Sequence, residues 1–102
     1  MKQDASTHAA LEGCMGQHVQ TQPNPVELHW QYAYGQIRVM DETCWRCAPL
    51  SYELGLLGGY YVIRRTDRRQ YASKGDVVKQ TPPAPKATAM DEWWKILHGV
   101  AI

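Results

Sequence analysis

Phenylalanine is absent from this 102-residue sequence, cysteine occurs only three times, and no apolar run is long enough to cross a bilayer. The N-terminal stretch MKQDASTHAALEG also lacks the apolar core of a secretory signal. We therefore expect a cytoplasmic protein without a membrane partner. The odd number of cysteines argues against a disulfide framework, and four tryptophans and six tyrosines take the place of phenylalanine in packing.

The sequence also has no large excess of either positive or negative charge. It contains 11 basic and 10 acidic residues, and its formal net charge is +1. The charge of the whole chain therefore does not point to nucleic acid, and an electrostatic partner would have to recognise a local patch. The chain carries no P-loop, no G-x-S-x-G and no H-E-x-x-H motif, so we predict that it is not an enzyme. Its length fits a single domain, residues 1–102, with a thin core.

The N-terminal segment, residues 1–20, predicts a helix of low intrinsic stability. Apolar residues recur with helical spacing in the stretch DASTHAALEGCMGQHVQ. Gly13 and Gly16 each lower helix stability by about 1 kcal/mol relative to alanine, so the helix needs a surface on which to dock. The alternative is that the first dozen residues are disordered. The two prolines of the following linker, residues 21–25, cannot continue a helix.

Residues 26–79 predict the sheet and a central helix. Apolar and polar residues alternate over 26–33 and again over 36–41, which indicates a first hairpin. A second hairpin is predicted over 60–78, with its turn at Thr66-Asp67.

The central helix is predicted in the second half of the stretch from residue 41 to residue 59. Leu50, Leu54 and Leu57 recur at helical spacing, and Gly58-Gly59 marks the end of the run. The C-x-x-C motif in this stretch would then lie in the loop or first turn that enters the helix.

The C-terminal part predicts a Pro/Ala linker over 80–89 and an amphipathic helix over 90–102. Asp91 can cap this helix, and Trp93 and Ile96 belong to its apolar face. Together these elements predict an α+β fold. It consists of a small antiparallel sheet of two hairpins, with an N-terminal helix, a central helix and a C-terminal helix packed on one face.

The clearest chemical motif is Cys44-x-x-Cys47. Two cysteines at this spacing can bind one zinc ion, which takes four sulfur or nitrogen ligands in a tetrahedron. Cys14 and His18 are four residues apart and would share one face of the predicted N-terminal helix. The four residues together predict a structural zinc site that holds this helix to the sheet. The alternative is that no metal binds and the cysteines pack as small apolar side chains.

Redox chemistry is a further hypothesis for the same motif. A predicted strand over 36–40, the C-x-x-C motif and a predicted helix follow one another, an order that resembles the thioredoxin arrangement. The resemblance implies that the N-terminus of the helix lowers the pKa of the first thiol, that of Cys44. It does not extend to an upstream βαβ unit, because a helix broken by prolines and a hairpin are predicted there.

Four arginines surround the predicted tip of the second hairpin: Arg64, Arg65, Arg68 and Arg69. Guanidinium groups bind carboxylates and phosphates, so the tip predicts a protein partner with an acidic surface or, as the alternative, nucleic acid. Trp93 and Trp94 point about 100° apart on a helix, so Trp94 is a candidate anchor for a partner. The alternative is that both rings pack over the open face of the sheet. We therefore predict a non-catalytic binding module, a small accessory or inhibitor protein that docks on a larger macromolecule. The alternatives are a zinc-stabilised nucleic-acid-binding domain and, third, a thiol oxidoreductase.

Overall fold

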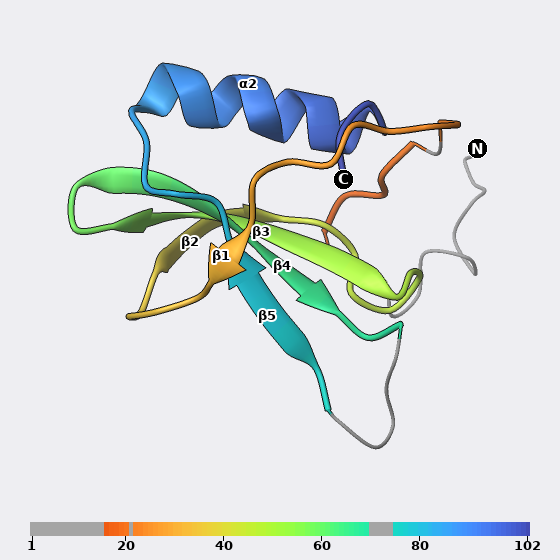
Figure 1. Cartoon of the computed structure of the whole chain (residues 1–102), viewed down its shortest axis with the longest axis horizontal. Coiled ribbons are helices and arrows are strands. Elements are labelled where there is room, and N and C mark those ends of the chain that lie inside the picture. The colour runs from red at the N-terminus through yellow and green to blue at the C-terminus, as the bar shows by residue number, and fades with distance from the viewer. Residues whose placement is uncertain (1–15, 21, 70–74) are drawn as a thin grey trace, which may run out of the picture.

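The computed structural model describes residues 16–20, 22–69 and 75–102. Within them the chain forms one antiparallel sheet of five strands and one helix, α2 (Lys86–Leu97), which lies across one face of the sheet (Figure 1). The order of the strands across the sheet is β1-β5-β4-β3-β2. In chain order they are β1 (Gln31–Tyr32), β2 (Arg38–Glu42), β3 (Leu50–Leu57), β4 (Tyr60–Asp67) and β5 (Val77–Gln80).

The central hairpin of the sheet is formed by β3 and β4. All eight residues of each strand are paired, from Leu50 with Asp67 to Leu57 with Tyr60. The turn is Gly58-Gly59, with φ angles of 59° and 91°. The most favoured two-residue hairpin turn needs positive φ at both positions, which glycine adopts at little cost. The predicted central helix is therefore wrong, because its leucines belong to a strand and its two terminal glycines close a hairpin.

The hydrophobic core lies between α2 and the face of the sheet that the helix covers. Leu54 and Ile63 pair across β3 and β4, and Trp93 and Ile96 join them from α2; each is at most 3% exposed. The predicted C-terminal helix is confirmed, with Trp93 and Ile96 on its buried face, but it ends at Leu97 and not at residue 102. The helix begins directly after Pro85, inside the predicted linker, where the fixed φ of proline suits a helix start.

The end of the chain turns back along the helix and holds the segment that precedes β1. The Val26 N–H donates to the Val100 carbonyl, and the Ile102 N–H donates to the Val26 carbonyl, both at 2.9 Å. Asp91 does not cap the helix as predicted, because it lies inside α2, where its carboxylate pairs with Lys95 at 3.1 Å.

The predicted N-terminal helix is wrong where the structure describes it. Residues 16–20, here called the N-terminal arm, run without helical structure, and Gln17 forms a parallel bridge with Thr43 just after β2. Residues 1–15, with the rest of the predicted helix, lie outside the described residues. The arm is therefore positioned by backbone pairing at the end of an edge strand.

The first predicted hairpin is also wrong, because β1 and β2 form opposite edges of the sheet. Residues 33–37 carry the chain from one edge to the other. Ile37 lies over Gly55, where an added Cβ would be 2.8 Å from the Ile37 Cδ1. Gly55 follows Leu54 in β3 and so points to the opposite face. The crossing segment therefore covers the face of the sheet that α2 leaves open.

Arg64 fastens the crossing segment to the sheet. Its Nη2 donates to the carbonyl oxygens of Tyr34 and, at 2.8 Å, Gly35, and its Nε donates to the Gln80 Oε1 at 3.1 Å. One guanidinium group thus joins the crossing segment, β4 and β5.

The second predicted hairpin turns later than expected. Strand β4 continues through Asp67 and pairs with β5, from Arg64 with Gln80 to Asp67 with Val77. No turn forms at Thr66-Asp67, so the four arginines do not surround a tight hairpin tip. The predicted return strand around Tyr71 lies outside the described residues.

Replacing Arg64 with methionine is expected to lower the free energy of unfolding by about 1–3 kcal/mol, because the variant loses hydrogen bonds from a charged donor. Urea denaturation monitored by tryptophan fluorescence measures the change. Arg38→Met is the matched control, because Arg38 is exposed on β2. Equal stability of the two variants would show that the guanidinium does not hold the crossing segment.

Candidate metal centre

The cysteine loop, residues 43–49, joins β2 to β3 and carries both cysteines of the C-x-x-C motif. Two hydrogen bonds anchor its first residue, which is buried: the Thr43 N–H donates to the Tyr52 carbonyl, and the Tyr52 N–H donates to the Thr43 Oγ1, each at 2.9 Å. This pairing fixes where the loop leaves the sheet.

Arg68, at the end of β4, holds the rest of the loop. Its Nη2 donates to the carbonyl oxygens of Trp45 at 2.7 Å and Ala48 at 3.0 Å, and its Nη1 donates to the Ser51 Oγ at 3.2 Å. Its backbone N–H also donates to the Pro49 carbonyl at 2.9 Å. These bonds satisfy carbonyl groups that have no strand partner, so they define the shape of the loop.

The N-terminal arm reaches the cysteine loop through Gln17. The Gln17 N–H donates to the Glu42 carbonyl at 3.1 Å, and the Cys44 N–H donates to the Gln17 carbonyl at 2.6 Å. Gly16 makes this approach feasible, since its φ is +80° and a Cβ there would lie 2.4 Å from the Glu42 carbonyl oxygen. This pairing places the next residue, His18, beside the cysteine loop.

Asp41 connects the arm to the helix. Its Oδ2 accepts hydrogen bonds from the Gln17 Nε2 at 2.6 Å and from the Trp93 Nε1 at 3.1 Å. One carboxylate therefore joins the arm, β2 and α2 around the cysteine loop.

The three described members of the predicted zinc set come together. The ligand atoms of His18, Cys44 and Cys47 all lie within 4.8 Å of one another, and the His18 Nε2 is 3.3 Å from the Cys47 Sγ. Cys44 is buried, whereas His18 and Cys47 are exposed. Cys14, the fourth predicted ligand, lies outside the described residues.

This group fits the coordination chemistry of zinc. Zinc binds imidazole nitrogen and thiolate sulfur at about 2.0–2.3 Å. Around a tetrahedral zinc ion, the ligand atoms are then roughly 3.3–3.8 Å apart. The observed group needs only small side-chain adjustments to reach these separations. The His/Cys/Cys group could therefore hold a metal ion.

A cavity of about 320 Å³ adjoins the ligand atoms, between the arm, the cysteine loop and the last residues of the chain. Tyr52 contributes to its lining and is 4% exposed. Burial raises the pKa of Tyr52 to about 12, although Arg65 and Arg69 act in the opposite direction. Its hydroxyl therefore remains protonated at neutral pH and does not supply an anionic ligand.

The thioredoxin-like arrangement lacks its helix. The residues that follow Cys47 enter strand β3, Leu50–Leu57, instead of a helix. No helix N-terminus is therefore available there to lower the pKa of the Cys44 thiol, and the redox hypothesis loses the element on which it depended.

Three of the four arginines in the predicted partner site contact other segments of the protein, and the fourth, Arg69, is more exposed than they are. Arg65 is buried, 4.6 Å from the Trp30 ring and 3.6 Å from the Glu27 carboxylate. Arg69 is about half exposed and pairs with Asp67 at 2.8 Å. Its hydrogen bond holds the pKa of the Asp67 carboxyl below the usual range.

That Arg64 and Arg68 bind backbone carbonyls could not be predicted, because those carbonyls belong to segments distant in the sequence. A role for these arginines in binding a partner stays a prediction. The same holds for Trp94, which is 55% exposed and stacks on His98 with a ring separation of 4.1 Å.

Arg68→Met is expected to loosen the cysteine loop. Loss of hydrogen bonds worth about 1–2 kcal/mol raises the population of the open loop, so trypsin should cleave after Arg46 roughly tenfold faster. Mass spectrometry of early digestion products measures that cleavage. Arg69→Met is the control, because its guanidinium binds Asp67 and not the loop. An unchanged cleavage rate in Arg68→Met would show that the Arg68 hydrogen bonds do not hold the cysteine loop.

The buried hydroxyl of Tyr52 should make the free energy of unfolding depend on pH in the alkaline range. Its folded pKa of about 12 lies above the ordinary value of 10.0, so the folded state binds this proton more tightly. The resulting stabilisation, about 2–3 kcal/mol, is fully present below pH 10 and is lost as pH rises towards 12. Urea denaturation between these pH values should show a steeper decline for the wild type than for Tyr52→Phe. Parallel declines would contradict the burial of an ionisable hydroxyl.

Comparison with protein-family models, with curated proteins and with solved structures found no match to this chain. Within the described residues, no helix has the length and apolar character needed to span a bilayer. The geometry of the His18, Cys44 and Cys47 group is therefore the observation from which a function can be argued.

Proposed function

We propose that this chain is a non-catalytic binding domain that contains one structural zinc ion. His18, Cys44 and Cys47 supply three ligands, and Cys14 supplies the fourth. The observation that carries the proposal is the convergence of three zinc-type ligand atoms within 4.8 Å from two segments far apart in the sequence.

The source of the ligands supports a structural role for the ion. The arm contributes His18, and the cysteine loop contributes both sulfur atoms. A zinc ion at this point would crosslink two segments that contain no complete strand or helix of their own. A chain of about 100 residues has a thin core, and a bound metal is one of the common ways to stabilise such a domain.

The ligand set also supports a role without catalysis. Catalytic zinc keeps one coordination position for water or substrate, whereas structural zinc is held by four protein ligands. With Cys14 in the fourth position, three cysteines and one histidine close the coordination sphere. Zinc then contributes to folding, and the chain acts through the surface that the ion organises.

Elemental analysis of the purified chain without a tag should find about one zinc ion per molecule. Chelation should lower the midpoint of thermal unfolding, because the binding free energy of a structural metal is part of the folding free energy. His18→Ala, Cys47→Ser and Cys14→Ser should each reduce the zinc content. His29→Ala is the matched control, because His29 is exposed and is not a member of the ligand group.

Two results would count against the proposal. One is a chain without metal whose three thiols react fully with a thiol reagent in the folded state. The other is equal zinc content in His18→Ala and His29→Ala. Full zinc occupancy in Cys14→Ser would contradict the fourth ligand alone and would point to an open coordination position.

A further inference from the structure

The two residues between the metal-binding cysteines, Trp45 and Arg46, both lie on the surface. Trp45 is 50% exposed, and the guanidinium carbon of Arg46 lies 5.4 Å from the centre of the Trp45 ring. Neither side chain contributes to the described core. The cysteine loop therefore presents a flat apolar ring and a cation directly to solvent.

The loop holds this pair in place before any partner binds. Arg68 donates to the Trp45 carbonyl itself, and the backbone of the preceding Cys44 is paired with Gln17 in the N-terminal arm. An exposed tryptophan on a fixed backbone loses little conformational freedom on binding, which favours its use as a contact residue.

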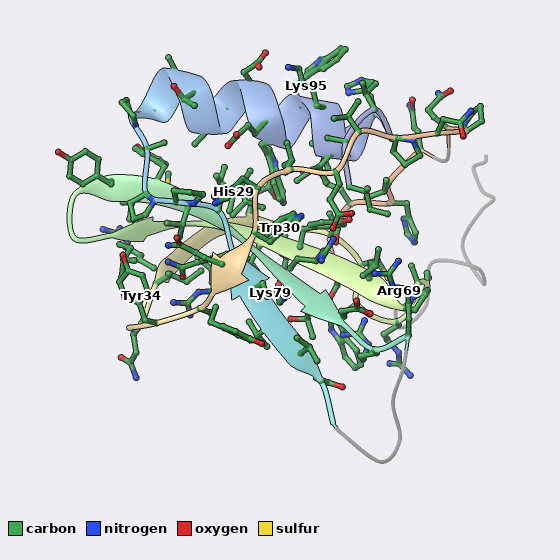
Figure 2. The ribbon with its side chains drawn as sticks, viewed as in Figure 1. His29, Trp30, Tyr34, Arg69, Lys79 and Lys95 are labelled. Atoms are coloured by element: carbon green, nitrogen blue, oxygen red, sulfur yellow. The ribbon has the colours of Figure 1, made fainter. Side chains whose placement is uncertain are left out.

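A second arginine, besides Arg46, lies near the cysteine loop. Arg69 lies at the same end of the sheet, because Asp67 pairs with Leu50 at the point where the cysteine loop enters β3 (Figure 2). The Arg69 side chain is 46% exposed, while that of its partner Asp67 is only 17% exposed. The loop itself contains no acidic residue. Because Arg69 shares its charge with the Asp67 carboxylate, the positive charge that this surface offers to a partner comes mainly from Arg46, with the more exposed Arg69 guanidinium as a second donor group.

We propose that Trp45, Arg46 and Arg69 bind a short stretch of single-stranded nucleic acid. One base stacks on the Trp45 ring, and the two guanidinium groups contact neighbouring phosphates. Aromatic side chains combined with cations are the usual means of binding single strands without sequence preference, because every base has a face that can stack. The inference rests on the proposed function, since zinc on Cys44 and Cys47 fixes the loop on both sides of Trp45.

The size of the surface favours a nucleic acid strand over a folded protein. Trp45 is the only exposed large hydrophobic residue of the cysteine loop. A stable protein interface buries about 800 Å² on each partner around an apolar centre, and one ring between two arginines does not supply that centre. A single strand needs only a stacking surface and a few cations.

The test uses the zinc-loaded chain, with its zinc content measured in the same preparation. Binding to a fluorescein-labelled oligothymidine is followed by fluorescence anisotropy at low ionic strength. Trp45→Ala is expected to weaken binding roughly tenfold through loss of one stacked base, and Arg46→Glu should weaken it further. The plot of log Kd against log salt concentration should have a slope of about 1.4 for two phosphate contacts.

Two control variants lie away from the loop and should bind like the wild type. Tyr60→Ala removes an aromatic ring that is 55% exposed next to the β3–β4 turn. Arg38→Glu reverses an exposed charge at the start of β2, whose other end leads into the cysteine loop. Both variants should keep their zinc, as should Trp45→Ala.

The possible failures can be told apart. A zinc-loaded chain that does not bind the oligonucleotide, or whose Trp45→Ala variant binds unchanged, overturns this inference and leaves the proposed function intact. Poly-glutamate that competes as well as unlabelled oligothymidine also overturns it, because the loop would then recognise charge alone, as on an acidic protein. A chain without zinc overturns the proposed function, and with it the argument that metal fixes the loop.

Discussion

The pairing of Gln17 with the end of β2 determines the geometry of the candidate metal centre. Two backbone hydrogen bonds, with the Glu42 carbonyl and the Cys44 N–H, align the arm beside the cysteine loop. His18 follows directly and lies against the Cys47 sulfur. The pairing requires a glycine at position 16, because a side chain there would collide with the β2 backbone. A single close backbone contact thus places ligands that are 26 to 29 positions apart in the sequence.

Strand β4 and the residue that follows it show how a small domain can use arginine as a structural residue. Arg64 holds the crossing segment, Arg65 packs on Trp30, and Arg68 holds the cysteine loop. The five donors of a guanidinium group can satisfy several carbonyls that lack a strand partner. Such carbonyls are common where irregular segments cross a sheet, and leaving them without partners would cost more than the hydrogen bonds gain. The arginine-rich stretch from residue 64 to residue 69 therefore has a structural use at three of its positions, two in β4 and one directly after it.

The sequence predicts local features better than strand pairing. The apolar face of α2 and the convergence of His18 with the two cysteines could be predicted, because helical periodicity and ligand chemistry are both visible in the sequence. The spacing of Leu50, Leu54 and Leu57 fits a helix, and this spacing is the reason for the wrong prediction of a central helix. Tyr52 and Leu54, two residues apart, both face the core, and this alternation is that of a strand. The pairing of β1 with β5 could not be predicted, because nothing in the alternation identifies a partner 47 to 49 positions away.

The contacts that hold the arm show what a bound metal ion would add to its stability. Fixing the backbone of five residues costs about 5–10 kcal/mol. The arm is held by three backbone hydrogen bonds, by one hydrogen bond from the Gln17 side chain and by the contact between the His18 Nε2 and the Cys47 Sγ. A typical hydrogen bond has a net worth of about 1 kcal/mol. Val19 adds only a partly buried side chain to the core. Structural zinc in small domains contributes about 10–16 kcal/mol of binding free energy, several times the net worth of one such hydrogen bond. A metal ion bound by both the arm and the cysteine loop would therefore hold these two segments together. The backbone around the exposed Trp45 would then be rigid.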